Sequence, residues 1–454
     1  MDAQVALPEG ESGSQLLHRV VADVARTFKD DLPGLDFPTN GAAFKKGFGD
    51  ALSRFEAARL GSPRRLEVAR ALCSALAGSC ELEENGERTP LWEVLGRKTG
   101  AAHAAKLTRG SGSPTLAIEI PFEGKTVRGD DALDLVEKLH ADHHMTTAAR
   151  DGLRWITLHA KENGGVIDLR GKKFAMLGAA AELSPAPLLL RGGASVLWVD
   201  PHAPKSAHAG TIAQDDSARD LLREPGAIAR AIETFANGEA VDIGMFAYAP
   251  GKGRELRLAE TMNAITEHLR ARGNVASVSM FVSPTSPANV QPEDVAVVRS
   301  RAKSPASWQR ALELSGVIKG PGFYGDDAHA VARGAIVLQG AAYQAAQYIS
   351  KTLRSEVWAH DGLRVSANVA GISRTRSLEH PLFLAAFEGA PSFGVRIFDS
   401  ATTRALATLL MLSDLLREPA PADSVHARQI HGGVYDVPWQ FEASVRAAAV
   451  LGAA

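Results

Sequence analysis

Residues 173–200 constrain the fold more strongly than any other stretch of this chain. Residues 174–177 form a short apolar run without polar alternation, which is typical of a strand buried on both faces. Gly178 ends the run, and Ser184 with the proline that follows it has the form of a helix N-cap and first helical position. A second apolar run covers residues 195–199. We therefore predict a strand, a turn, a short helix and a second strand, the opening unit of a dinucleotide-binding sheet.

Beyond a Gly-rich linker near residue 165, apolar strand-like runs alternate with amphipathic helical segments. Repeated strand–helix units with hydrophobic strands favour a parallel sheet covered by helices on both faces. We predict an α/β chain with a Rossmann-like, doubly wound parallel sheet over residues 166–454. A mostly α-helical domain over residues 1–165 precedes it, with a small hairpin expected over residues 115–129.

Composition narrows the classes of partner. The chain has 454 residues, a formal net charge of −2 and 45% hydrophobic residues, which gives no reason to expect a nucleic-acid or membrane-surface partner. No apolar run approaches about 18 residues, so no membrane span is predicted. The N-terminal residues are polar and acidic, without a secretory pattern. We expect a cytoplasmic protein.

Four segments share one resemblance. Residues 362–375, GLRVSANVAGISRT, match a helix-to-strand passage and the turn after it, with Gly371 and Thr375 in place. Residues 241–251 match a strand and its turn, in which Ala247 replaces an asparagine. Residues 278–286 match a strand that ends in hydroxyl groups at Ser283 and Ser286, and Asn263 has a counterpart in the helix between these strands. Together they resemble the short-chain dehydrogenase/reductase superfamily.

This resemblance implies an NAD(P)-dependent oxidoreductase that acts on a carbonyl, hydroxy or enoyl group of a small-molecule or acyl-type substrate. Asp200 lies 22 positions after Gly178 and would accept hydrogen bonds from a ribose, which favours NAD over NADP. The alternative is that Asp200 is only a solvated carboxylate at a strand end. The implied cofactor-binding residues are Gly178, Ser184, Asp200, Ala247, Asn263, Gly371 and Thr375.

The phosphate-binding turn departs from the family pattern. Where the family has Gly-x-x-x-Gly-x-Gly, this chain has Gly178, Glu182 and Ser184. The enoyl reductase branch of the family also has serine at the last of these positions. A carboxylate at Glu182 would oppose a pyrophosphate by about 1 kcal/mol or more where it is poorly solvated. If a nucleotide binds, Glu182 must therefore turn away from the phosphates.

The predicted catalytic helix also departs from the pattern, in which a lysine follows the tyrosine by one turn and lowers its pKa. Tyr343 is followed one turn later by Gln347. Tyr348 and Lys351 are three residues apart, whereas Tyr343 and Lys351 are eight apart and diverge by about 80° around an α-helix. The candidate catalytic residues are Ser283, Tyr343, Tyr348 and Lys351. Each tyrosine could instead pack between helices or subunits, and the serine could be a turn former.

Two classes of function remain open. The first is the oxidoreductase. The second is a redox-inactive, dehydrogenase-like domain that serves a non-redox step such as isomerisation or dehydration, or a binding or assembly role. A long helix predicted over residues 330–359 corresponds to the helix through which the family forms dimers, so a homodimer is expected. Histidines 140, 143, 144 and 159 have helical spacing but no HExxH order, and no metal site is predicted.

Overall fold

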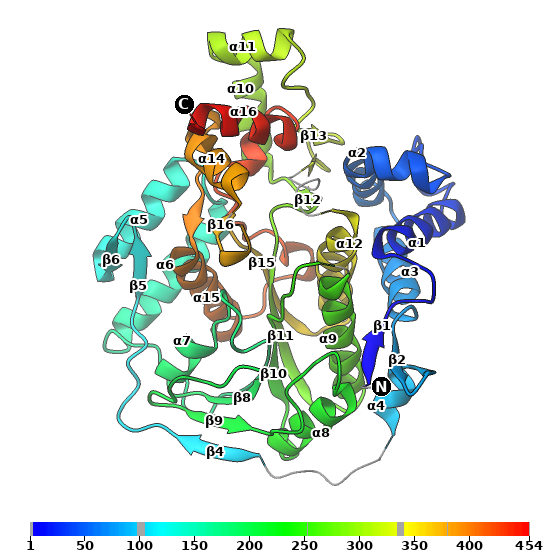
Figure 1. Cartoon of the computed structure of the whole chain (residues 1–454). Coiled ribbons are helices and arrows are strands. Elements are labelled where there is room, and N and C mark those ends of the chain that lie inside the picture. Colours follow the sequence, from blue (N-terminus) through cyan, green and yellow to red (C-terminus); the bar gives the residue numbers. More distant parts are fainter. Residues whose placement is uncertain (1–2, 98–104, 252, 334–339, 379, 454) are drawn as a thin grey trace.

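The computed structural model describes residues 3–97, 105–251, 253–333, 340–378 and 380–453, and its centre is one seven-stranded sheet (Figure 1). Six strands are parallel, and the edge strand β4 pairs antiparallel with β9. Counted along the chain, the parallel strands lie in the order 3-2-1-4-5-6, so the direction of strand addition reverses between β7 and β10. The sheet order is β15 (Arg364–Val369), β11 (Val275–Val282), β10 (Val241–Met245), β7 (Lys173–Leu177), β8 (Ser195–Val199), β9 (Thr211–Gln214) and β4 (Lys106–Arg109).

The central strands are buried on both faces. Along β7, Ala175 and Leu177 face α8 (Pro225–Ala236) and α9 (Arg254–Arg270). The alternate residues of β7, Phe174 and Met176, belong to a second core built with α6 (Thr147–Glu162), α7 (Ala186–Arg191) and α15 (Ser400–Leu416). Because both sides of each strand must be apolar, the sequence shows continuous apolar runs there. The predicted α/β class and mostly parallel sheet are confirmed.

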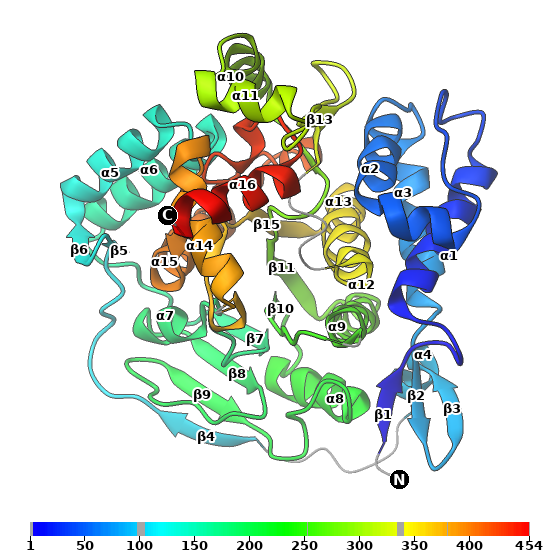
Figure 2. The ribbon, with the colours of Figure 1, turned by 45° about the horizontal axis from the view of Figure 1, so that its top comes forward.

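Segments before residue 165 lie on both faces of the sheet (Figures 1 and 2). The helices α1 (Gly13–Thr27), α2 (Gly41–Leu60) and α3 (Arg65–Ala77) form a core with the helical stretch that begins at residue 341. On the other face, α5 (Gly129–Ala141) and α6 pack towards α15. The predicted division at residue 165 stays a prediction, because packing alone does not identify the segments that fold independently.

The predicted hairpin is confirmed. Strands β5 (Glu119–Phe122) and β6 (Lys125–Arg128) pair antiparallel. Glu123 and Gly124 join them with φ angles of 48° and 75°. Positive φ at both central residues gives the turn a twist that matches the paired strands.

The long helix predicted over residues 330–359 is wrong at its start. Val331–Ala332 form strand β14, and the helical stretch begins with α12 (Ala341–Gln344). It continues as a π-helix (Ala345–Leu353) and ends as α13 (Arg354–His360). The wider turn is visible in two side chains that bond carbonyls five residues back: Ser350 Oγ to Ala345 O at 3.3 Å and Thr352 Oγ1 to Gln347 O at 3.0 Å.

Two further expectations are corrected. Residues 431–441 predict a last edge strand from their sequence, but this segment contains a 3₁₀ turn (Val434–Asp436). Gly432 and Gly433 before it have φ angles of 62° and 82°, which an extended strand cannot accommodate. The polar stretch over residues 201–222 contains β9, which the sequence did not indicate.

The remaining elements surround the sheet. A small antiparallel sheet holds β1 (Gln4–Ala6), β2 (Glu81–Glu84) and β3 (Glu87–Pro90), and α4 (Leu91–Gly96) follows it. Above the carboxyl ends of the central strands lie α10 (Pro292–Lys303), α11 (Ser307–Leu314), β12 (Ala288–Asn289), β13 (Phe323–Tyr324), α14 (Pro381–Gly389) and α16 (Phe441–Ala453) (Figure 1). Among the described residues, no helix combines the length and the apolar character that crossing a membrane requires.

Candidate functional site

A cleft of about 1260 Å³, partly open to solvent, lies at the carboxyl ends of the central parallel strands. Its walls come from the segments that follow β7, β10, β11 and β15, and from one side of the helical stretch after residue 340. Because the strand order reverses between β7 and β10, the loops after these two strands diverge to opposite sides and leave a crevice. The cleft is therefore positioned by the topology of the sheet itself.

Tyr343 is the central polar residue at one end of this cleft. Its half-buried phenol interacts with the hydroxyls of Ser283 and Thr285, which follow β11. These two hydroxyls are themselves 2.8 Å apart. Burial raises the pKa of Tyr343 well above its ordinary value, and the nearby Glu255 carboxylate raises this pKa further. The Tyr343 phenol is therefore protonated at neutral pH, with its oxygen directed at the two hydroxyls.

Lys351 lines the same cleft and is held by a buried carboxylate. Its Nζ lies 3.4 Å from Glu255 Oε1. Gln347 Nε2 donates to the same oxygen at 2.9 Å, and the backbone N–H of Ala249 donates to Glu255 Oε2 at 3.3 Å. Burial raises the pKa of Glu255, and the Lys351 ammonium opposes that shift. Glu255 thus ties the loop after β10 to the helix that carries Tyr343.

The π-helix explains how Tyr343 and Lys351 reach one cleft. Eight α-helical steps overshoot two full turns by about 80°. A π-helical turn contains more residues, so the same eight steps end closer to two full turns. Six of the eight steps lie within Ala345–Leu353. The widened helix therefore brings both side chains to the cleft, where an α-helix would separate them.

The other end of the cleft begins at the turn after β7. Gly178 has a φ of 87°, and a Cβ built there would lie 2.2 Å from Ala247 N, in the loop after β10. Neither the backbone conformation nor the space tolerates a side chain. The ends of β7 and β10 therefore touch through backbone atoms alone at the reversal point.

Both carboxylates at this end already have partners. Asp200, 8% exposed, accepts from Ala180 N at 3.1 Å and from His202 N at 2.9 Å. Glu182 Oε2 accepts from Arg376 N at 3.2 Å and lies 3.6 Å from Arg376 Nε. The negative charge of Glu182 is thus offset by an arginine that reaches across from the segment after β15.

The remaining predicted site residues divide into two groups. Ser283, Tyr343, Lys351, Gly371 and Thr375 line the cleft. Ser184 does not, because its buried Oγ accepts from Ala186 N at 3.3 Å at the start of α7. Asn263 is also buried outside the cleft, where its Nδ2 donates to Ser350 O at 3.0 Å and joins α9 to the π-helix.

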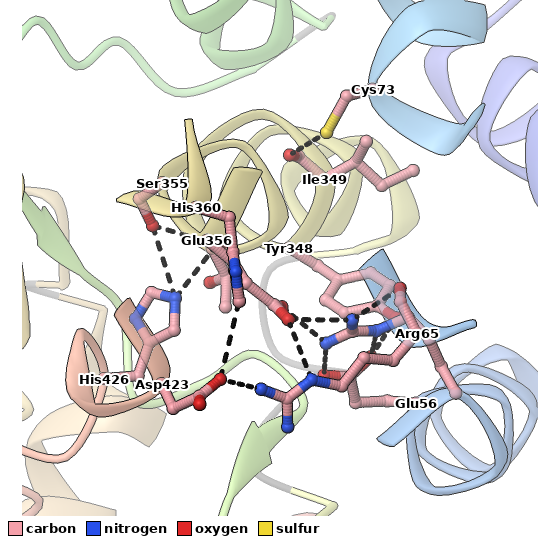
Figure 3. Close-up of polar contacts among 12 residues, drawn as sticks. Glu56, Arg65, Cys73, Tyr348, Ile349, Ser355, Glu356, His360, Asp423 and His426 are labelled. Carbon is pink, nitrogen blue, oxygen red and sulfur yellow. Dashed lines mark hydrogen bonds and ion pairs between the residues drawn. The ribbon is translucent and has the colours of Figure 1, made fainter. Parts of the chain in front are cut away.

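Tyr348 lies in a different environment, against the N-terminal helices (Figure 3). Its hydroxyl donates to Glu56 Oε2 at 2.5 Å, 292 positions away in sequence. Glu56 pairs with Arg59 at 2.7 Å, and Arg59 pairs with Glu356 at 2.8 Å. Burial raises the pKa of Tyr348 well above its ordinary value. Tyr348 therefore belongs to a buried polar network that joins α2 to the end of the helical stretch.

Sequence reasoning missed Thr285 and Gln347, which line the cleft, and Glu255, which is buried beside it. Thr285 lies two residues after the predicted Ser283 and was not distinguished from other turn hydroxyls. Gln347 was noted only as a missing lysine, whereas it orients Glu255. Glu255 gave one usable sequence signal, because it adjoins the apolar face of the predicted amphipathic helix. In the structure it is 4% exposed. A carboxylate there predicts a buried cationic partner.

A second group of buried ionisable side chains lies away from the cleft. One ligand atom each from Asp294, His431 and Asp436 lie within 4.8 Å of one another. Burial raises the pKa of Asp436 to about 7. His431 Nδ1 accepts from Gly433 N at 3.0 Å, so the ring proton sits on Nε2, which faces Asp294 Oδ1 at 3.4 Å. A metal ligand would need a bare Nε2 and a proton on Nδ1, so this arrangement favours a cluster of buried polar groups, with Nε2 facing Asp294, over a metal site.

Comparison with known proteins adds no assignment: no protein-family model matches the chain, and no curated protein matches it. A functional conclusion therefore depends on the geometry of the cleft and on the chemistry of its side chains.

Proposed function

We propose that this protein is an NAD(P)-dependent oxidoreductase that acts on a carbonyl, hydroxy or enoyl group of an acyl-type substrate. The observation that carries the proposal is the convergence of Ser283, Tyr343 and Lys351 in one cleft at the reversal point of the sheet. The 3-2-1-4-5-6 order is the one used by dinucleotide-binding doubly wound sheets, whose ligands lie in this crevice. A Rossmann-like fold is part of the proposal.

In such a reaction, three side chains would have separate roles: proton donation, a hydrogen bond to the substrate oxygen, and stabilisation of negative charge. Tyr343, protonated because its pKa is raised, would donate a proton to the substrate oxygen during reduction and take it back during oxidation. Ser283 would hold that oxygen through a hydrogen bond. Lys351, fixed by Glu255, would supply positive charge beside the developing oxyanion. A bound nicotinamide nucleotide would supply or accept the hydride.

The cleft offers several features to a dinucleotide. Gly178 keeps the turn after β7 free of side-chain bulk, and Thr375 lines the cleft opposite that turn. Arg376 offsets the negative charge of Glu182. The backbone carbonyl of Glu182 accepts from Arg404 Nη1 at 3.4 Å. These two arginines would face the pyrophosphate. Asp200 stands at the end of β8, where a ribose would replace its contact with His202. This placement favours NAD over NADP.

An apolar pocket supports an acyl-type substrate. It encloses about 590 Å³ and shares Thr285, Ile372 and Leu378 with the cleft, so the two spaces adjoin. Its remaining walls come mainly from α14 and α16, with Phe383 and Phe387 among them. An acyl chain that enters this pocket would gain about 0.8 kcal/mol for each buried methylene. Chain length should therefore affect affinity strongly.

A second candidate is favoured by the Glu182–Arg376 pair. It occupies the end of the cleft at which a pyrophosphate would bind, and Asp200 is already hydrogen-bonded. A protein in which this pair stays closed would use Tyr343 for a non-redox proton transfer, such as isomerisation or dehydration, or would use the cleft for binding and assembly. The two candidates differ only in whether a nucleotide displaces the pair.

A thermal-shift titration with NADH and with NADPH tests the proposal. A nucleotide at a hundredfold excess over its Kd should stabilise the protein by about 2.7 kcal/mol. Acyl thioesters of increasing chain length, added with the nucleotide that binds, should then be turned over with falling KM. If neither nucleotide stabilises the protein but an acyl thioester does, the result would contradict the redox proposal and support the second candidate.

A homodimer would need a surface other than the expected one. Tyr348, Ile349 and Leu353 of the helical stretch are fully buried and form a core with α1 and α3 of the same chain. The N-terminal helices thus cover the face through which the family forms dimers. The cytoplasmic location stays a prediction.

A further inference from the structure

We infer that a second binding site, for a small molecule that carries phosphate groups, lies outside the cleft. A pocket of about 800 Å³, partly open to solvent, is lined by α2, the segment before β13, Arg333 and α16. Five of its lining residues are cations: Lys45, Lys46, Lys319, Arg333 and Arg446. None of the five lines the cleft, so the inference does not depend on the proposed oxidoreductase activity.

The positive charge of this pocket is local and largely uncompensated. The whole chain carries a formal net charge of −2, so five cations around one pocket do not follow from the overall composition. Among the residues that the structure describes, Lys45, Lys46, Lys319 and Arg446 have no acidic partner, and all four are exposed. Like charges held together repel, so an anionic ligand would relieve their repulsion.

One cation is built into the wall. Arg333 is 5% exposed, and its Nε donates to Asp50 Oδ1 at 2.8 Å. The same Asp50 oxygen accepts from the hydroxyl of Tyr324 in β13. Asp50 therefore fixes the guanidinium between α2 and β13. A guanidinium fixed in this way presents its donors in a fork that matches phosphate oxygens.

The backbone around the pocket also favours an anion. Gly47 has φ −132° and ψ 25°, so α2 is interrupted there and restarts as a helix at the pocket wall formed by Phe48 and Gly49. The start of a helix carries partial positive charge. On the opposite side, Gln440 N donates to Lys319 O at 2.6 Å and joins the start of α16 to the wall that bears Lys319. The segments that carry Lys319 and Arg446 are therefore joined to each other by a backbone hydrogen bond.

The number and spread of the cations favour a ligand with several phosphate charges over an anion with a single charge. Several cations spread over a pocket of this size suit a ligand with two or more phosphate charges, whereas a single carboxylate would contact only one or two of them. Inorganic pyrophosphate is the simplest probe with this chemistry. The diphosphate of NADH offers the same chemistry, so the experiment must separate the two ligands and the two sites.

Isothermal titration with pyrophosphate at low ionic strength tests the inference. The protein should bind it, and Lys45→Ala/Lys46→Ala should weaken binding by on the order of tenfold or more, because charge-assisted hydrogen bonds are lost. Lys125→Ala/Lys205→Ala removes the same charge from exposed lysines outside the pocket and should leave the affinity unchanged. Affinity should also fall as salt is added.

The same variants separate this pocket from the cleft. NADH affinity should be the same in Lys45→Ala/Lys46→Ala as in the unmodified protein. Lys319→Glu, which reverses one charge at the opposite wall, should abolish pyrophosphate binding while leaving the thermal unfolding midpoint unchanged. The inference is overturned if pyrophosphate does not bind at low salt, or if the pocket variants and the control variant bind it equally.

Discussion

The two ends of the cleft are built to different degrees. At the end formed by β11 and the π-helix, Tyr343 interacts with the hydroxyls of Ser283 and Thr285, and Lys351 pairs with the buried Glu255. At the end formed by the segments after β7 and β15, Glu182 bonds Arg376, and the nearby Asp200 bonds backbone N–H groups of the surrounding chain. Under the proposed function, the first end could receive a substrate oxygen as it stands, whereas the second would have to exchange contacts before it could hold a nucleotide.

Under the proposed function, the two ends would differ in how much of the binding free energy is spent on rearranging the protein. A preassembled set of donors costs little reorganisation when the substrate arrives. A nucleotide that has to displace the Glu182–Arg376 pair would lose part of its affinity to that exchange. We therefore expect substitutions at the Tyr343 end to change the reaction rate strongly. Substitutions at the Glu182 end should change nucleotide affinity only modestly.

The largest effect should come from Tyr343→Phe, which removes the proton donor while keeping the ring. The rate of substrate reduction should fall by about 10²–10⁴-fold. Tyr348→Phe is the matched control, because its hydroxyl bonds Glu56 outside the cleft. That control should keep the rate and lower the free energy of unfolding by about 1–3 kcal/mol. Equal losses of rate in both variants would remove the distinction between the two tyrosines.

Next in size is the effect of Lys351→Met on stability. This substitution leaves Glu255 buried without its cation, which should lower the free energy of unfolding by about 3–5 kcal/mol in urea titrations. Adding Glu255→Gln to Lys351→Met should restore much of the loss, since no unpaired charge then remains. If the double variant is less stable than Lys351→Met alone, the buried pair does not hold this end of the cleft together.

A smaller effect is expected from Glu182→Gln at the opposite end. Removing one negative charge beside the phosphates should tighten NADH binding by about fivefold, which corresponds to about 1 kcal/mol. Arg376→Ala should weaken it, because Glu182 then loses its counter-charge. Fluorescence titration of NADH measures both, and Glu9→Gln, an exposed acid far along the chain, is the control. Unchanged affinity in both variants would separate this end of the cleft from the nucleotide.

The smallest change is expected in the pH profile of reduction. Tyr343 must be protonated to donate, and its pKa is raised above the ordinary value of 10.0. As pH rises, the protonated form should persist through that value, so kcat/KM should not fall between pH 7 and about 10. A fall centred below about pH 9 would mean that Tyr343 ionises more easily than its surroundings allow, or that another group is the donor.

Much of the fold could be predicted because both faces of its strands are apolar. The runs over β7, β8 and β10 and the helical pattern of α15 indicated these elements directly. Strand β9 could not be predicted, because only Ile212 and Ala213 give it an apolar signal within a polar stretch. Residues 431–441 do not form the edge strand that their sequence predicts, because the positive φ angles of Gly432 and Gly433 turn the chain out of an extended path.

The candidate site was predictable in part. Ser283 and Tyr343 followed from the resemblance, and both line the cleft. The pairing of Lys351 with this end depends on a π-helix, whose wider turn leaves no periodic signal in nine residues. The partner of Tyr348 is Glu56, 292 positions earlier, and nothing local in either segment indicates that contact. Long-range pairs and unusual helical turns are the features that sequence periodicity does not encode.

Hydrogen exchange shows most directly where a nicotinamide nucleotide binds this protein. Hydrogen–deuterium exchange of the protein with and without saturating NADH should slow at residues 178–184, 245–250 and 370–378, which surround the cleft. Exchange around residues 45–49 should not change, because they line the separate basic pocket. Protection confined to residues 45–49, or no protection anywhere, would contradict a dinucleotide site at the reversal point of the sheet.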